Sequence, residues 1–187
     1  NSLGGDITST TAGIDFLDAV TLTDAVAMDS SGGGGNIVFQ STLTGTAIDA
    51  QTLALDSGLG DITFEDTVGA VSLGGVTITG AATVTAEGTF DAASFTQTNG
   101  SVLTDFQDAV TTTGDFTFDG TGLLLQDAAH TIGGAMALTN TGAFTTDAAA
   151  NVTVNGAFTQ IGGGSNSLGG DITSTTAGIN FLDAVLL

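Results

Sequence analysis

Apolar and polar residues alternate one by one along many short stretches of the chain. A period of two is typical of a β-strand that has one buried face. The runs are short and end at Gly, Asp or Asn, residues that favour turns and corners, as at Gly74–Gly75. The pattern therefore predicts many short strands separated by corners. Examples with apolar side chains on one side and Thr on the other are Ile62–Phe64, Val76–Thr79, Phe116–Phe118 and Val152–Val154.

Helices are not expected in this chain. Lys and Arg, two strong helix formers, are absent, and Gly or β-branched residues interrupt every window of helical length. Hydrophobic residues nevertheless make up 41% of the chain, so a core can form. Most of them are Ala, Val, Leu, Ile and Phe mixed with Thr, a composition that fits pleated, half-buried sheets. The chain is therefore expected to be all-β.

A Phe-x-Asp-x-Val motif marks the places where successive strands are expected to meet. Its Phe is predicted to face the core, the next residue to face outward, Asp and its neighbour to form a corner, and Val to begin the next strand inward. Counting weaker versions, the motif commonly recurs at intervals of about twenty residues, typical of coils in a parallel β-helix. The predicted structural core anchors are Phe16, Val20, Phe64, Val68, Phe106, Val110, Phe181 and Val185.

These elements predict a parallel β-helix, or β-solenoid, with coils of roughly 20–25 residues. Successive coils would stack about 4.8 Å apart and bury their inward Phe, Ile, Leu and Val against one another. A single coil cannot bury its own inward face, so each would be stabilised by its neighbours. The uneven spacing of the anchors predicts loops of variable length on one side of the solenoid, unless some turns are assigned to the wrong residues.

The first 22 residues are repeated almost unchanged at the other end of the sequence. We interpret residues 1–165 as one long sequence period of a continuous solenoid and residues 166–187 as the start of the next, in a window cut from a longer chain. The second copy is expected to enter the same coil position again, with both substituted positions facing outward. The copies are Asn1–Leu22 and Asn166–Leu187, and they differ only at Asp15, which becomes Asn180, and Thr21, which becomes Leu186.

GDITS at Gly5–Ser9, GDITF at Gly60–Phe64 and the Phe-x-Asp-x-Val motifs resemble a known type of repeat. They are similar to the repeats of large secreted bacterial surface proteins of the filamentous-haemagglutinin and autotransporter-adhesin type. The resemblance extends over most of the chain and lies in the general pattern of the repeats. It implies a right-handed parallel β-helix, display at the cell surface and a role in adhesion or in extracellular fibres.

The charge balance excludes several classes of partner. The chain has no Lys or Arg, 20 Asp and Glu residues and a formal net charge of −20. Without cationic side chains it cannot neutralise phosphates, so nucleic-acid binding is not expected. An anionic membrane surface would repel it, and no stretch of about 18 apolar residues would span a bilayer as a helix. Cys is absent, so no disulfide framework is predicted.

Pairs of neighbouring carboxylates are candidates for acid–base catalysis on a solenoid, as in enzymes that degrade polysaccharides. Cationic groups that would hold an acidic polymer are absent, as are Trp and Tyr side chains that would stack on sugars. We therefore interpret these carboxylates as corner residues and predict that the chain is not an enzyme. The candidate pairs are Asp15 with Asp18, Glu65 with Asp66, and Asp105 with Asp108.

His130 is the only side chain of the sequence that titrates near neutral pH. No Cys or Ser motif accompanies it that would make a catalytic triad, and one His among scattered Asp residues does not make a zinc site. His130 is therefore predicted to be a surface or corner residue.

Calcium is the one metal for which candidate ligands arise, because it prefers carboxylate and carbonyl oxygens at turns. Gly-Asp-Ile segments similar to calcium-binding nonapeptide β-rolls make Asp6, Asp61 and Asp171 the candidates. The offsets of these segments do not recur every nine residues. We therefore predict no required cofactor and expect diffuse screening of the carboxylates by solvent cations.

Thr-x-Thr triplets raise a further alternative, because ladders of outward Thr on a flat solenoid face are characteristic of ice-binding proteins. The triplets occur at Thr21–Thr23, Thr77–Thr79 and Thr83–Thr85. Their spacing is irregular, which favours ordinary solvent-facing strands.

Taken together, the sequence predicts a structural segment of a giant tandem-repeat bacterial surface protein. The segment would be a stiff, anionic rod within an extracellular fibre, sheath or stalk, and its partners would be its own neighbouring repeats or subunits. An adhesin rod that presents a binding face to host cells, glycans or ice is the alternative.

Overall fold

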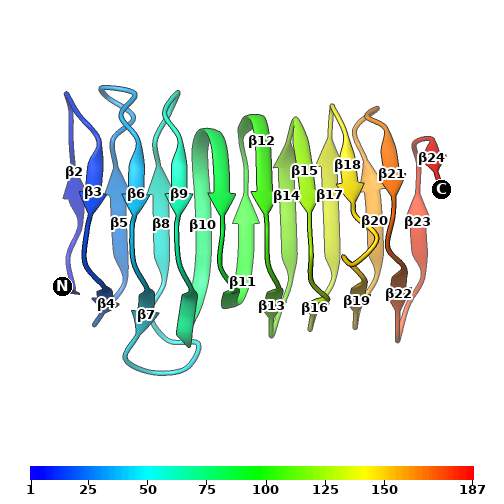
Figure 1. Cartoon of the computed structure of the whole chain (residues 1–187), viewed down its shortest axis with the longest axis horizontal. Coiled ribbons are helices and arrows are strands. Elements are labelled where there is room, and N and C mark those ends of the chain that lie inside the picture. The colour runs from blue at the N-terminus through cyan, green and yellow to red at the C-terminus, as the bar shows by residue number, and fades with distance from the viewer.

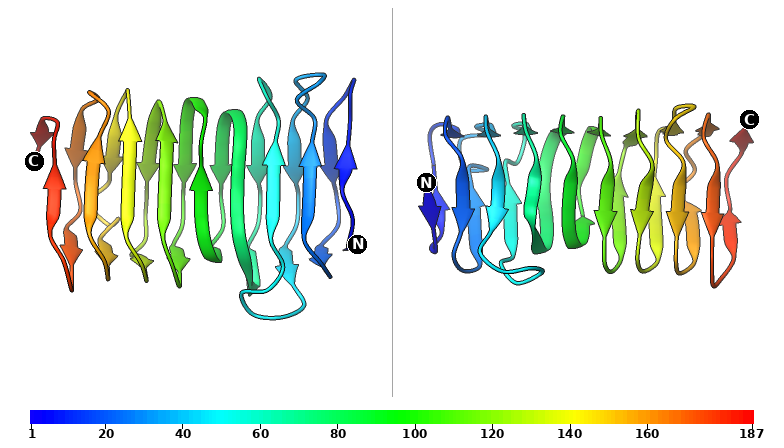
Figure 2. Two further views of the ribbon diagram at one scale, coloured as in Figure 1. Left: turned by 180° about the vertical axis from the view of Figure 1, so that it is seen from behind. Right: turned by 60° about the horizontal axis from the view of Figure 1, so that its bottom comes forward.

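The computed structural model describes residues 1–187 as one elongated β-solenoid (Figure 1). Its 24 strands pair in parallel and stack into about nine coils of roughly 21 residues. Each coil contributes a segment of strand to each of three faces, and the two termini lie at opposite ends of the rod (Figure 2). The predicted all-β solenoid is thus confirmed. The chain contains no helix of the length and apolarity needed to cross a membrane.

Three parallel ladders of strands run along the rod and form its faces. Face 1 consists of β1 (Ser2–Leu3), β4 (Val20–Leu22), β7 (Leu43–Gly45), the first parts of β10 (Val68–Ala86) and β11 (Phe90–Gln97), β13 (Val110–Thr112), β16 (His130–Ile132), β19 (Val152–Val154) and β22 (Ile172–Ser174).

Face 2 consists of β2 (Ile7–Thr8), β5 (Val26–Asp29), β8 (Leu53–Asp56), the middle of β10, the end of β11, β14 (Phe116–Gly120), β17 (Met136–Asn140), β20 (Phe158–Ile161) and β23 (Ile179–Phe181). Face 3 consists of β3 (Ile14–Phe16), β6 (Ile37–Phe39), β9 (Ile62–Phe64), the end of β10, β12 (Gly100–Phe106), β15 (Gly122–Leu125), β18 (Phe144–Thr146), β21 (Asn166–Leu168) and β24 (Val185–Leu186).

A single hydrophobic core of 36 buried residues runs through the interior of all the coils. Most three-residue strands have the same burial pattern, with two inward side chains on either side of one outward side chain, as in β4, β13 and β18. In the first three coils the rings of Phe16, Phe39 and Phe64 stack along the axis with centroids 5.3 Å apart at each step. The core is therefore built by contacts between coils as well as within them, where Phe90, Phe95 and Phe106 of one coil pack edge to face.

Loops of different length project from the coils at more than one corner. Ser30–Asn36 lies between faces 2 and 3, whereas Thr46–Thr52 lies between faces 1 and 2 and exposes Ile48. These insertions stretch the sequence spacing between stacked partners from 20 residues, as in Phe90 with Val110, to 27 residues, as in Val26 with Leu53. The variable loops are therefore not confined to one side of the solenoid.

One coil is formed by a strand that turns all its corners without interruption. β10 extends from Val68 to Ala86 and pairs with strands of all three faces, with register shifts after Val68 and between Ala81 and Thr83. The corner predicted at Gly74–Gly75 is therefore wrong as a strand end, because both residues lie inside β10. These irregularities in register let the strand bend while its backbone pairing continues.

Most of the Phe-x-Asp-x-Val motifs lie at the corner between faces 3 and 1. The Phe ends a strand of face 3 and the Val begins the strand of face 1 in the next coil, as in Phe64 with Val68 and Phe106 with Val110, which are all buried. The first motif lies at the same corner, with Val20 buried and Phe16 half-buried in the terminal coil.

Phe181 and Val185 lie on other faces than the remaining anchors, and Val185 is also more exposed than any of them. Phe181 ends β23 on face 2 and is half-buried, while Val185 begins β24 on face 3 and is 38% exposed. Both residues lie in the last coil, which has a neighbouring coil on one side only. Val185 is therefore not a core residue in this structure.

The second copy of the repeated segment enters the solenoid one face away from the first. Ser2–Leu3 lies on face 1, whereas its counterpart Ser167–Leu168 lies on face 3. The expectation that the same coil position is entered again is therefore wrong. The local coil itself is preserved, because Ser2 pairs with Thr21 and Ser167 pairs with Leu186, each 19 residues further on. A shift of one face is tolerated because all three faces share the same alternation of inward and outward residues.

Candidate functional site

Acidic and amide side chains at the corners accept backbone hydrogen bonds from the next coil. Asp6 Oδ1 accepts the N–H of Ala27 at 2.8 Å, and Asp115 Oδ1 accepts the N–H of Ala135 at 2.7 Å. Asp61 Oδ1 accepts both the N–H of Thr83, at 3.1 Å, and its hydroxyl, at 2.6 Å. These groups join coils where the strands end and backbone donors would otherwise be unpaired.

The three calcium candidates lie at different corners of different coils. Asp6 precedes β2, Asp61 precedes β9 and Asp171 precedes β22, so the fold brings no two of them together. Asp6 and Asp61 already bind donors of the next coil, and the N–H of Asp171 donates to Asn151 Oδ1 at 2.9 Å. No group of three or more His, Cys, Asp or Glu side chains lies close enough together to hold a metal ion.

At least one carboxylate of each pair considered for catalysis accepts hydrogen bonds from other residues. Asp15 accepts two bonds from the Gln40 amide at 3.1 Å, and Asp105 accepts bonds from Gln107 and Gln126 at 3.1 and 2.7 Å. The carboxylates of Asp66 and Asp108 accept the N–H of the residue that follows each of them. None of the three pairs lines the pocket of the chain.

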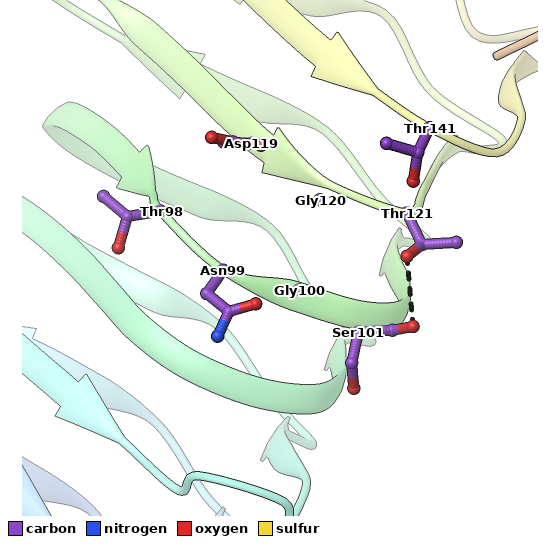
Figure 3. A pocket seen from close by; sticks show the side chains of 8 residues that line it. All are labelled: Thr98, Asn99, Gly100, Ser101, Asp119, Gly120, Thr121 and Thr141. Atoms are coloured by element: carbon purple, nitrogen blue, oxygen red, sulfur yellow. Dashed lines mark hydrogen bonds between the residues drawn. The ribbon is translucent and has the colours of Figure 1, made fainter. Parts of the chain in front are cut away.

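The pocket is a polar hollow at the corner between faces 2 and 3 (Figure 3). It has a volume of about 310 Å³ and no hydrophobic lining residue. Asp119 supplies its only charge, and the hydroxyl of Thr121 donates to the Ser101 carbonyl at 3.1 Å across the stacked turns. The hollow lacks a second titratable group that could act as an acid or base. Sequence reasoning missed it, because the lining residues come from three successive coils.

His130 lies inside the solenoid, so its prediction as a surface or corner residue is wrong. It occupies the inward position at the start of β16, between the equivalent positions of Val110 and Val152. The N–H of Val110 donates to His130 Nδ1 at 3.2 Å, and Nε2 is buried without a partner. Burial lowers the pKa of His130 to about 4, although the charges of Asp147 and Asp108 oppose this effect. The side chain is therefore neutral near pH 7 and shielded from solvent.

Buried amides form a second polar feature inside the last coils. Gln160 Nε2 donates to Asn140 Oδ1 at 2.8 Å and to Asp183 Oδ2 at 2.9 Å. Asn166 Nδ2 donates to Gln160 Oε1 at 2.9 Å. Asn140, Gln160 and Asn166 are all fully buried. The alternation in Phe158-Thr159-Gln160 is the sequence signal for an inward amide, since Gln160 takes the phase of Phe158.

Outward Thr residues form rows that run along the rod, one residue per coil. On face 2, Thr96 pairs with both Thr77 and Thr117. The longest row lies on face 1, where each member pairs with the next in register. Its residues are Thr111, Thr131, Thr153 and Thr173. The rows thus run from coil to coil, whereas the sequence suggested triplets along single strands.

Comparison with known proteins identified no relative of this chain. No protein-family model, curated protein or solved structure matches the chain. The solenoid fold therefore stands on the strand pairing and the stacked core alone.

Proposed function

We propose that this chain is a structural segment of an extracellular fibre, sheath or stalk built from a tandem-repeat bacterial surface protein. The observation that carries the proposal is the unbroken stacking of its coils. One core and three parallel ladders run through all the coils. Because strand edges pair readily with further strands, ladders of this kind can be extended by more of the same solenoid.

The backbone bonding supports a mechanical role. The chain makes 116 backbone hydrogen bonds, and those between paired strands link one coil to the next along the axis. Each contributes about 0.5–1.5 kcal/mol net. Separating two coils requires that the bonds of all three faces break together with the stacked core between them. The rod should therefore resist extension and bending.

The surface charge supports a rod that stays separate from its neighbours. The chain has 20 acidic residues and no Lys or Arg to neutralise their charge. Like charges on adjacent rods repel each other over about 8–10 Å at physiological salt. The same charge disfavours nucleic acid and anionic membranes, so we propose the chain's own copies or repeats as partners. We propose no catalytic role and no cofactor.

Electron microscopy of the purified chain across a concentration series tests this proposal. We expect straight filaments one solenoid wide that lengthen with concentration and remain single at physiological salt. Monomeric rods at every concentration, or tangled lateral aggregates, would contradict a fibre-forming role.

An adhesin rod with a binding face is the second candidate, favoured by the Thr row of face 1. Thr131, Thr153 and Thr173 are exposed and successive along the axis, so they present hydroxyl and methyl groups at a regular spacing of about 4.8 Å. Thr131→Glu with Thr153→Glu should abolish binding to ice or to glycan arrays if this row is the binding face. The matched control is Thr145→Glu on face 3. Equal binding by all three proteins would exclude the row.

A further inference from the structure

We propose that residues 1–22 of a second copy of this chain can replace residues 166–187, so that copies join head to tail as one solenoid. The inference rests on the proposed fibre role and identifies the surface through which the units join. That surface is formed by β18, β19 and β20, which we call the docking platform (residues 144–161).

The docking platform holds residues 166–187 by pairing and by specific side-chain contacts. β18, β19 and β20 pair in parallel with β21, β22 and β23. Gln160 binds the side chains of both Asn166 and Asp183 at 2.9 Å. The ring of Phe181 lies 4.9 Å from that of Phe158, measured between centroids.

Residues 1–22 carry the same groups at every one of these positions. Asn1, Phe16 and Asp18 correspond to Asn166, Phe181 and Asp183. The two positions that differ between the copies are Asn180 and Leu186, and both are exposed, so neither faces the platform. A second copy can therefore offer the platform the same side chains that it already binds.

A glycine of the first copy meets the same requirement as its counterpart. A Cβ on Gly170 would lie 2.5 Å from the carbonyl oxygen of Ala150 in the docking platform, so that position requires glycine. Its counterpart Gly5 has no atom within 4 Å of the same point. Residues 1–22 thus retain a glycine whose small size matters only when a coil like the platform lies beneath.

The geometry of the two copies determines how joined chains would be related. Seven coils and two strands of an eighth separate β1 from β21. Each added chain would therefore advance the rod by about 37 Å at a coil spacing of about 4.8 Å. It would also be rotated by one face, a third of a turn, which the equivalent alternation of all three faces allows.

The exchange should cost little free energy, because the incoming segment forms the same strand pairs and hydrogen bonds that the departing segment gives up. The released residues 166–187 regain conformational freedom, whereas association restricts the motion of the incoming chain. Exchange of identical elements between copies is a low-cost route to assembly, and its extent should rise with protein concentration.

Paired cysteines test the exchange directly, because the chain has no Cys of its own. Thr8 is the counterpart of Thr173, which pairs in register with Thr153. Neighbouring parallel strands lie about 4.8 Å apart, within the range that a disulfide spans. Within one chain, Thr8 and Thr153 lie in the first and eighth coils. A disulfide in the T8C/T153C variant can therefore form only between chains.

We expect oxidised T8C/T153C to give a ladder of covalent multimers on a non-reducing gel, which collapses to monomer on reduction. T8C/T131C is the matched control, since Thr131 is exposed and one step away in the same row, and it should stay monomeric. T8C/L182C reports stacking of intact ends, because Leu182 follows Phe181 on face 2 as Thr8 follows Ile7 on the same face. A ladder only in T8C/L182C would overturn the exchange while leaving the fibre proposal intact. Equal ladders in all three variants, or none in any, would also overturn it.

A disulfide that holds the last coil in place provides a second test. Oxidised T153C/T173C would lock residues 166–187 onto the docking platform within one chain. We expect this form to lose filament growth and to recover it on reduction. Growth at the same rate in both states would contradict the exchange.

Discussion

Single aromatic residues stabilise this rod by stacking on their counterparts in the coils above and below. Phe64 is 1% exposed and its ring lies 5.3 Å from that of Phe39, whereas Phe16 is half-buried in the terminal coil. We expect Phe64→Ala to lower the free energy of unfolding by about 3–5 kcal/mol, since it removes a fully buried ring. Phe16→Ala is the control and should cost clearly less. Chemical denaturation measures both, and equal losses would contradict a core that depends on neighbours.

His130 makes the stability of the rod depend on pH. Its pKa is about 4 in the folded chain and about 6.5 when unfolded, so the unfolded chain binds more protons between these values. Stability contributed by the neutral side chain is therefore present above about pH 6.5 and lost as the pH falls toward 4. The loss should be roughly 3 kcal/mol.

His130→Val matches the residues above and below it and removes the titrating group. Unfolding free energies at pH 7 and pH 4.5 should therefore fall less in the variant than in the parent chain. The same fall in both proteins would show that His130 does not titrate as its burial implies.

At the scale of single elements, the corners join successive coils through side chains. Asp61 illustrates this role, because its Oδ1 accepts both the N–H and the hydroxyl of Thr83. Asp61→Ala should lower the unfolding free energy by roughly 1–2 kcal/mol, and Asp61→Asn by less because an acceptor oxygen remains. Asp18→Ala at an exposed corner is the control. If all three variants melt alike, the corner carboxylates are not structural.

Short strands could be predicted from sequence because inward and outward residues alternate. In Val152-Thr153-Val154 the pattern and the observed burial agree residue by residue. The uninterrupted β10 could not be predicted, since Gly74 and Gly75 signal a corner whether or not pairing continues through it. The interior positions of His130 and Gln160 were also missed. Polar residues are normally placed outside, and their phase within the strand was the only signal to the contrary.

At the scale of the whole molecule, the candidate surfaces are formed by residues that stacking brings together from different coils. The polar hollow around Asp119 and the Thr row of face 1 join residues that lie about 20 positions apart, so no local motif marks them. The near-identity of the two terminal segments was visible in the sequence. Their displacement by one face was not, because it depends on the summed length of every loop between them.

The central claim is that this chain forms a rod whose coils continue from one copy to the next. Helical reconstruction of its filaments by cryo-electron microscopy tests this most directly. We predict an unbroken coil spacing of about 4.8 Å across chain boundaries, an advance of about 37 Å per chain and a rotation of a third of a turn beyond the twist of the solenoid. An advance of about 43 Å, from nine stacked coils, would indicate intact ends in contact without exchange. A break in the coil spacing at each boundary, or the absence of filaments, would contradict the claim.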